Sequence, residues 1–405
     1  MTPQTRLSNS LNGFSGLLGL AVSGGSDSLA LLFLANRWAR QNGVTLKVAT
    51  VNHGLRSEAV QECDAVAKHC AELGVSHEVL SWSWNKAGNL QAEARSGRYD
   101  ALAAWAKREG LAAVAIGHTQ DDVAETFLMR LARGSGVTGL ARMQASWGER
   151  GINWLRPLLG CNREELRDVL HEQSVDWAED SSNSDTRYGR VKTREALATL
   201  ESLGITRESL AQTAERLASA RAALDELLQD VAAKAVQLDG PDLTLAVEPL
   251  QSAPEETRQR LFAQAIGWIG QTPYPPRRQA VQNALAAILE GQKATLNGCV
   301  ITAEKGRIRV AREWAAVEGL VTKSDGLWDG RFALTGPHSE GLTIAALGET
   351  GLLLCPDWRE VGLPRASLLA SPAVWRGDEL VAAPMAGFDA GWQAILAQKP
   401  DFLSG

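Results

Sequence analysis

The chain has 405 residues, more than a single hydrophobic core ordinarily holds, so two or three domains are expected. Its 45% apolar and 22% charged residues are typical of soluble globular proteins, and no apolar run reaches the roughly 20 residues of a bilayer span. The net charge of −6 gives no overall attraction to nucleic acid, so an RNA substrate would need locally clustered basic residues. We therefore expect a cytoplasmic protein with no membrane partner.

The five cysteines are scattered and include no Cys-x-x-Cys pair. This pattern weighs against a disulfide framework, a structural zinc site and an iron–sulfur cluster. The six histidines are equally dispersed, which weakens any transition-metal hypothesis. Most of the cysteines and the 13 tryptophans are expected to be core residues.

Residues 17 to 132 alternate short apolar runs with segments of helical period, a pattern that predicts βαβ units and a parallel sheet. Strands are expected at 17–22, 45–51, 76–80 and 112–116, and helices at 29–40, 58–73 and 89–108. The polar stretches 23–28, 52–57 and 117–122 follow three of these strands. Because ligands bind beyond the carboxyl ends of parallel strands, these three loops are expected to meet at one ligand site.

The second half of the chain has a different character. A long helix is expected at 206–236, followed by strands at 243–247, 295–302 and 307–310 and helices at 255–269 and 276–289. Beyond Glu313, short alternating apolar runs rich in Gly and Pro indicate a mostly β unit. The predicted domains are 1–200, a parallel-sheet nucleotide-binding domain; 201–315, a helical connector and small α+β domain; and 316–405, a mostly β domain.

The stretch from Ser23 to Ser28, Ser-Gly-Gly-Ser-Asp-Ser, joins the first strand to a helix. Backbone N–H groups at such a turn form a cradle for phosphate, and Gly24 and Gly25 allow close approach of the ligand. Asp27 would repel a phosphate unless a cation lies between them, so it is the candidate Mg²⁺ ligand. The alternative is an ordinary Gly-rich turn with a helix cap.

This loop lacks the Gly-Lys-Ser/Thr of a Walker A motif, and it resembles the PP-loop of the ATP pyrophosphatase family. Further motifs resemble the tRNA(Ile)-lysidine synthetase family within it. They are Asn52-His53-Gly54-Leu55-Arg56, Gly117-His118-Thr119-Gln120-Asp121-Asp122, Arg130-Leu131-Ala132-Arg133-Gly134, Arg156-Pro157-Leu158-Leu159 and Trp177-Ala178-Glu179-Asp180.

The resemblance covers residues 17 to about 195 and implies an adenine-nucleotide hydrolase-like (PP-loop) catalytic domain that uses ATP and Mg²⁺. It implies a two-step reaction on a tRNA(Ile) with a CAU anticodon. ATP adenylates C2 of the wobble cytidine at position 34, and free L-lysine then displaces AMP to give lysidine, which changes codon reading from AUG to AUA. The C-terminal domains would bind tRNA, and a homodimer is left open.

The helix expected from about Asp121 carries candidate catalytic residues at three- and four-residue spacing. His118 and Asp122 are expected near the reacting groups, with Arg130 and Arg133 toward phosphates or the tRNA. Asp121 and Glu125 form an adjacent row that is either functional or an acidic, solvated first turn.

Further candidates lie on neighbouring loops. The candidate nucleotide-binding residues are Ser23, Gly24, Gly25, Ser26, Asp27, Ser28, His53, Arg95 and Gly117. The basic cluster Arg190, Lys192 and Arg194, with Arg133, is the candidate tRNA contact, although a solvated linker has the same composition. Arg95 and Arg98 either contact ATP or tRNA or only solvate their helix.

Two rival functions remain open at this point. A tRNA thiolase of the same superfamily would adenylate a base and insert sulfur, but it needs reactive or cluster-binding cysteines. A nucleotide-sensing or tRNA-binding module would need no catalytic groups, although the chain keeps each polar group that adenylation requires.

Overall fold

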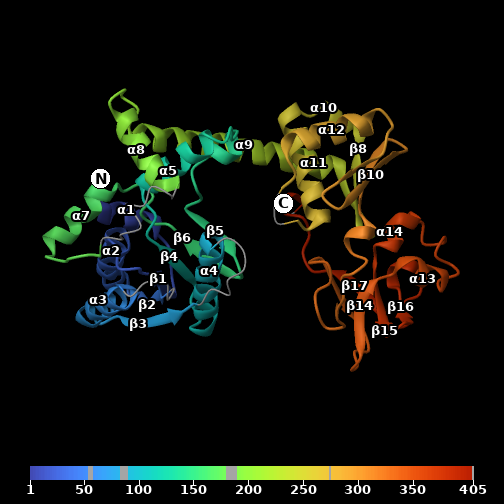
Figure 1. Cartoon of the computed structure of the whole chain (residues 1–405), viewed down its shortest axis with the longest axis horizontal. Helices are drawn as coiled ribbons and strands as arrows, with labels where there is room; N and C mark the ends of the chain where they lie inside the picture. The colour runs from blue at the N-terminus through green and yellow to red at the C-terminus, as the bar shows by residue number, and fades with distance from the viewer. Residues whose placement is uncertain (53–57, 83–89, 179–188, 273–274, 404–405) are drawn as a thin grey trace. The chain divides into compact units, whose positions relative to one another are not determined.

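The computed structural model describes residues 1–52, 58–82, 90–178, 189–272 and 275–403. The chain divides into two compact units, Met1–Arg221 and Ala222–Gly405 (Figure 1). Within the described ranges, no helix is both long and apolar enough to cross a membrane.

The first unit is built on a six-stranded sheet in the order β3-β2-β1-β4-β6-β5. Its strands are β1 (Leu17–Ala21), β2 (Thr45–Asn52), β3 (Ser76–Ser81), β4 (Ala113–Ile116), β5 (Ser146–Glu149) and β6 (Ile152–Leu155). Neighbouring strands are parallel except that β5 runs antiparallel to β6. The four expected strands and the parallel sheet are confirmed.

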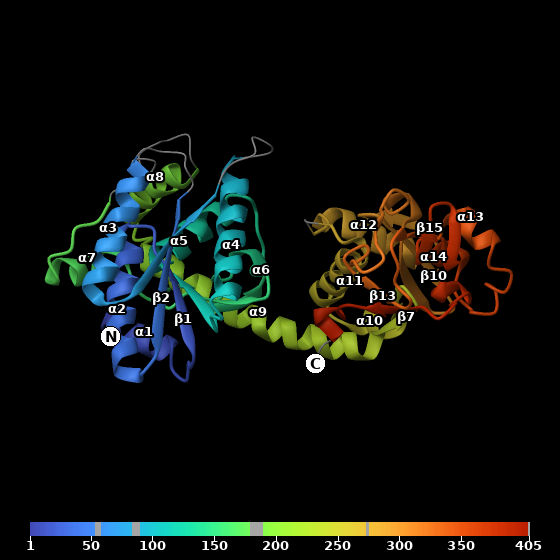
Figure 2. The same cartoon turned by 90° about the horizontal axis from the view of Figure 1, so that it is seen from below.

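Helices cover both faces of this sheet, with α2 and α3 on one face and α4 on the other (Figure 2). The helices of this unit are α1 (Pro3–Ser10), α2 (Ser26–Asn42), α3 (Glu58–Leu73), α4 (Leu90–Arg108), α5 (Gln120–Leu131), α6 (Val137–Leu140), α7 (Arg163–Glu172) and α8 (Gly189–Glu201), and α9 (Arg207–Ala235) begins in this unit and ends in the second. Along β1, Leu18 and Leu20 enter the core beneath α2, whereas Ala21 enters the core beneath α4. Because both faces are buried, this strand reads as a continuous apolar run.

The strand order creates a crevice between β1 and β4. From β1 the chain adds β2 and then β3 on one side, and it then crosses over to place β4 on the other side of β1. The loops that leave β1 and β4 therefore diverge, which is the topological switch point where ligands bind in open α/β sheets.

The second unit begins with a five-stranded sheet in the order β7-β8-β11-β10-β9. Its elements are β7 (Val236–Asp239), β8 (Asp242–Ala246), α10 (Val247–Ser252), α11 (Glu255–Gly270), α12 (Arg278–Leu289), β9 (Ala294–Leu296), β10 (Cys299–Glu304) and β11 (Arg307–Arg312). The single strand expected at 295–302 is instead a hairpin. Asn297 and Gly298 both have positive φ, as a two-residue hairpin turn requires.

The rest of the second unit is mostly β, as expected. It contains β12 (Thr322–Lys323), β13 (Phe332–Thr335), β14 (Leu342–Ala346), α13 (Gly348–Leu353), α14 (Arg365–Leu369), β15 (Pro372–Arg376), β16 (Glu379–Ala382) and β17 (Gln393–Leu396). Trp328 and Trp392 are buried in its own core, apart from the core around α11. The division of the chain into domains at residues 200 and 315 stays a prediction.

Candidate nucleotide site

The turn between β1 and α2 has the geometry of an anion cradle. Gly24 has a φ of 92°, a left-handed conformation that favours glycine, and α2 begins at Ser26. Ser28 holds the turn, because its Oγ accepts from the Ser23 amide at 3.1 Å and donates to the Gly25 carbonyl at 2.9 Å. The N–H groups at the start of the helix and the helix dipole favour a phosphate at this point.

Gly117, just after β4, lets the second loop approach this turn closely. A Cβ at Gly117 would lie 3.0 Å from the carbonyl oxygen of Asp27 and 3.1 Å from the Cα of Ser28. Both of those atoms belong to backbone that cannot move aside cheaply. The absence of a side chain at Gly117 therefore brings the ends of β1 and β4 together.

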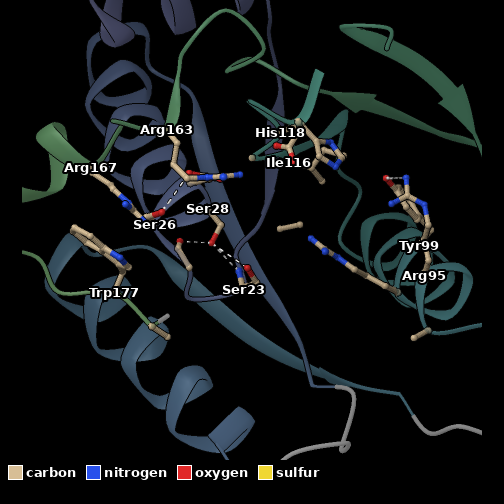
Figure 3. A pocket seen from close by; sticks show the side chains of 18 of the residues that line it. Ser23, Ser26, Ser28, Arg95, Tyr99, Ile116, His118, Arg163, Arg167 and Trp177 are labelled. Atoms are coloured by element: carbon tan, nitrogen blue, oxygen red, sulfur yellow. Dashed lines mark hydrogen bonds and ion pairs between the residues drawn. The ribbon is translucent and has the colours of Figure 1, made fainter. Parts of the chain in front are cut away.

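A cavity of about 530 Å³ opens between these loops, within the size range of small-molecule sites. Figure 3 shows Arg167 and Trp177 on one side of the turn and Arg95 and Tyr99 on the opposite side. The expected site residues that line the cavity are Ser23, Gly25, Ser26, Asp27, Ser28, Arg95, Gly117, His118, Asp122 and Arg194.

Asp27 faces a guanidinium inside this cavity. Its Oδ2 accepts from Arg163 Nε at 3.1 Å, and its Oδ1 accepts from Ser26 Oγ at 3.3 Å. Burial raises the pKa of Asp27 above its usual value, while Arg163 opposes that rise. The Arg163 charge therefore offsets part of the cost of burying the Asp27 carboxyl group beside the phosphate cradle.

Asp121 and Glu125 are buried, so the acidic row is not a solvated helix face. The Oε1 of Glu125 accepts from Arg194 Nε at 2.7 Å and lies 3.8 Å from Arg163 Nη1. Asp121 accepts from the Arg163 amide at 2.8 Å. The carboxylates and arginines form one ion-pair network under the cavity, and nearby carboxylates raise the pKa of Arg163 despite its burial.

Asp122 closes the N-terminus of α5. Its Oδ2 accepts from both the amide and the hydroxyl of Thr119, at 2.9 and 3.1 Å, and the Thr119 hydroxyl accepts from the Asp122 amide at 3.4 Å. This reciprocal cap fixes a carboxylate on the cavity wall beside His118.

His118 accepts a hydrogen bond from an arginine. Its Nδ1 lies 2.9 Å from Nε of Arg156. The pKa of His118 is lowered to about 3, mainly by burial; Asp122 opposes this shift, and the guanidinium groups of Arg156, Arg98 and Arg95 add to it. The imidazole is therefore neutral at physiological pH.

The structure does not bring every expected residue to the cavity. Arg130 does not line the cavity, because its guanidinium donates to the Gly139 carbonyl at 2.7 Å, and its catalytic role stays a prediction. Eight residues beyond Asp122, it lies about 12 Å further along the helix, since each residue adds 1.5 Å. Arg133 and Lys192 are exposed outside the cavity. His53 and the Arg190 side chain lie outside the described residues.

Sequence reasoning missed Arg163, Arg167 and Trp177, which line the cavity from the α7 side. The available signal was the capping box formed by Asn162 and Glu165, which marks a helix start immediately before Arg163. The cap locates the helix but not its partner, because Arg163 pairs with a residue 136 positions away.

Comparison with known proteins agrees with this geometry. Residues 4–201 match a family model described as a PP-loop domain. The chain is 48% identical over 389 residues to a tRNA(Ile)-lysidine synthase from Ruegeria pomeroyi, covering 96% of this chain and 93% of that protein. The chain belongs to the tRNA(Ile)-lysidine synthase family. It is thus an ATP-using PP-loop enzyme of the tRNA-modifying ligase class, as the resemblance predicted.

Further relatives carry the same name. A tRNA(Ile)-lysidine synthase from Wolbachia pipientis is 34% identical and covers 83% of this chain and 80% of that protein. A tRNA(Ile)-lysidine synthase from Bradyrhizobium diazoefficiens is 38% identical and covers 72% of this chain and 88% of that protein. Among solved structures, a U34-tRNA thiolase from Methanococcus maripaludis is 21% identical, covers 54% of this chain and 78% of that chain, and has a TM-score of 0.47.

Proposed function

We propose that this enzyme adenylates C2 of the wobble cytidine, at position 34, of a CAU-anticodon tRNA(Ile) and then joins free L-lysine to that carbon to give lysidine. The observation that carries this proposal is the cavity at the β1–β4 crevice, where the phosphate cradle, Asp27 and His118 meet in a member of this family. The product would read AUA rather than AUG.

In the first step, the C2 oxygen of the cytosine attacks the α-phosphorus of ATP, and the bond to pyrophosphate breaks. The turn from Ser23 to Ser28 would hold the leaving pyrophosphate, with the α2 N-terminus stabilising its charge. Arg95, on the opposite wall, would face the nucleotide or the anticodon base. The loop lacks the lysine of a Walker A motif, which suits departure of pyrophosphate rather than γ-phosphoryl transfer.

In the second step, the ε-amine of lysine attacks C2, the C2–O bond breaks, AMP leaves and the ε-nitrogen loses a proton. The amine must be neutral to attack, so the Asp122 carboxyl group on the cavity wall suits the recruitment and orientation of an ammonium group before the proton leaves. The neutral His118 beside Asp122 adds no positive charge that would repel it.

We assign Mg²⁺ to Asp27. No cluster of three metal-ligating side chains occurs in the part of the chain that the structure describes. That is compatible with Mg²⁺, which is commonly held by one or two carboxylates together with substrate phosphates and waters. The Asp27 carboxyl group, on the cavity wall beside the cradle, fits this donor set. When bound, the ion would neutralise charge on the departing pyrophosphate.

The tRNA would extend beyond the cavity over exposed basic residues. Arg133 and Lys192 are solvent-exposed on the first unit and suit contacts with phosphates. The domains predicted at 201–315 and 316–405 would bind other parts of the tRNA. The separate hydrophobic cores around Leu261 and Trp328 support independent folding units in that region.

The cysteines do not suit the thiolase alternative. All five are buried, none lines the cavity, and burial raises the pKa of each thiol. A buried thiol of raised pKa is a poor sulfur carrier.

The experiment that tests the proposal separates the two steps. Full-length protein is mixed with α-³²P-labelled ATP and unmodified CAU tRNA(Ile) without lysine, and label is followed on the tRNA. We expect one AMP per tRNA with release of pyrophosphate, and release of that AMP when lysine is added. Transfer of label to a control tRNA with guanosine at position 34, or no transfer to the CAU tRNA, would contradict the proposal.

A further inference from the structure

Arg156 lies next to His118 because of the strand register. Ala115 of β4 pairs with Leu155 of β6, and both strands are parallel. His118 follows the end of β4 by two residues and Arg156 follows β6 directly. The carboxyl ends of adjacent parallel strands thus place the imidazole and the guanidinium side by side, within 2.9 Å.

The Arg156 guanidinium is held from two further directions. The Cζ atom of Arg156 lies 3.7 Å from the ring centroid of Trp147, close enough for a cation–π contact. The Nη1 atom of Arg156 donates to the Gln144 carbonyl at 2.7 Å. Trp147 is itself stacked on the buried Trp154, with ring centroids 5.9 Å apart. The aromatic pair and the carbonyl fix the plane of the guanidinium, and with it the direction of the Nε–H bond.

A fixed guanidinium decides which nitrogen of His118 carries the proton. Arginine has donors and no acceptor, so Nδ1 of His118 must present its lone pair to Arg156. A neutral imidazole with Nδ1 unprotonated carries its proton on Nε2. Since His118 lines the cavity and Arg156 does not, Nε2–H is the polar atom left to serve the ligand.

We propose that Arg156, held by Trp147, is a positioning residue that keeps His118 as an Nε2–H donor toward the reacting groups. This inference rests on the proposed function, which supplies those groups. His118 then acts by donating a hydrogen bond to an oxygen that gains charge, on the cytosine carbonyl or the α-phosphoryl group, and it does not accept the proton of the lysine ammonium. The groups that face it are Asp122 from α5, Arg156 after β6, and Arg95 and Arg98 from α4.

A double-mutant cycle tests the proposal. We expect His118→Ala to lower kcat for adenylation by about 10²–10³, the usual loss for one oxyanion donor. Arg156→Met should give a loss of at least about tenfold with the KM for ATP changed by less than about twofold, and the double variant should lose little more than His118→Ala alone. If the fold-loss in kcat of the double variant equals the product of the two single losses, the proposal is overturned, because Arg156 would then act independently of His118.

Two further variants guard against a simple folding defect. Trp147→Ala removes the surface that holds Arg156 and should also lower kcat, whereas Trp147→Phe should restore most of it. Arg40 in the first unit donates to the Leu73 carbonyl at 2.9 Å and does not line the cavity, so Arg40→Met is the control and should leave kcat unchanged. Equal activity of wild type and Trp147→Ala would contradict the role given to Trp147.

A spectroscopic measurement separates this inference from the proposed function. In ¹⁵N-histidine-labelled full-length protein without substrate, the signal missing from His118→Ala should show an unprotonated Nδ1 and a protonated Nε2 at pH 7. A proton on Nδ1 would overturn the proposal even if the wild type makes lysidine. A wild type that makes no lysidine but shows this tautomer would contradict the proposed reaction alone.

Discussion

Arg163 Nε lies 3.1 Å from Oδ2 of Asp27, and the same guanidinium lies 3.8 Å from Oε1 of Glu125. One arginine at the start of α7 thus joins the carboxylate beside the phosphate cradle to the buried carboxylate of α5. The pairing opposes the rise that burial gives to the pKa of Asp27.

We predict that Asp27→Ala abolishes adenylation while leaving the fold intact. The substitution removes the one carboxyl group of the turn, and Asp27 lies at the surface of the cavity rather than in a core. The measurement is pyrophosphate release in the presence of CAU tRNA, with circular dichroism as the check on folding. Release at the wild-type rate would refute the role of Asp27 in holding the cation.

Arg163→Met should lower the stability of the first unit by about 2 kcal/mol, because it leaves buried Glu125 and half-buried Asp27 with fewer partners. Urea unfolding followed by tryptophan fluorescence measures the change. Adding Glu125→Gln should recover part of the loss, since a neutral amide needs no cation. A double variant that loses the full sum of both single losses would argue against direct coupling.

Gly117→Ala should weaken ATP binding and destabilise the first unit by about 1–3 kcal/mol, the usual cost of overpacking. The new Cβ would contact the backbone of Asp27 and Ser28 at 3.0–3.2 Å, and that backbone forms the cradle. Gly148→Ala is the matched control, because nothing lies within 4 Å of its added Cβ. Isothermal titration calorimetry with ATP should show weaker binding by Gly117→Ala than by Gly148→Ala. Equal affinities of the two variants for ATP would contradict the close approach of the Gly117 loop to the cradle.

The lowered pKa of His118 makes stability pH-dependent in a defined direction. The folded pKa of about 3 lies below the usual 6.5, so as pH falls below 6.5 the unfolded chain binds a proton that the folded chain excludes. Between pH 6.5 and 5.0 the wild type should lose up to about 2 kcal/mol more stability than His118→Asn. Urea unfolding at the two pH values checks this, and an identical pH dependence would show that the imidazole is not held neutral.

Lys192 and Arg194 should differ in how they affect tRNA binding. Lys192 is exposed, so Lys192→Gln should lower the dependence of tRNA affinity on salt by nearly one counterion, with little loss of stability. Arg194 donates to buried Glu125, so Arg194→Gln should instead lower stability and activity. The check is a titration of tRNA binding at several salt concentrations. If Arg194→Gln lowers the salt dependence and Lys192→Gln does not, Arg194 contacts the tRNA and the prediction is wrong.

Much of the first unit followed from the sequence because its signals are local. Apolar runs such as 17–22, bounded by Ser and Gly, mark buried strands, and the carboxyl ends of parallel strands share an edge whatever their packing. That rule predicts from the sequence that Ser23 and His118 lie at one site, and both line the cavity.

The ion pairs could not be predicted in the same way. A row such as Asp121 and Glu125 has the same spacing whether it faces water or a buried arginine, and only tertiary packing decides between the two. Arg130 shares a helix face with Asp122 yet binds the Gly139 carbonyl and does not line the cavity. The Asn297–Gly298 turn was missed because a strand-like run hid a two-residue hairpin.

The most direct measurement of the central claim is incorporation of labelled lysine into unmodified CAU tRNA(Ile), followed by mass analysis of the nucleoside at position 34. The proposed function predicts one lysine per tRNA, dependent on ATP, with the added mass on the wobble cytidine and nowhere else. Lysine found on another nucleotide, or no incorporation by a preparation that binds both ATP and tRNA, would contradict it.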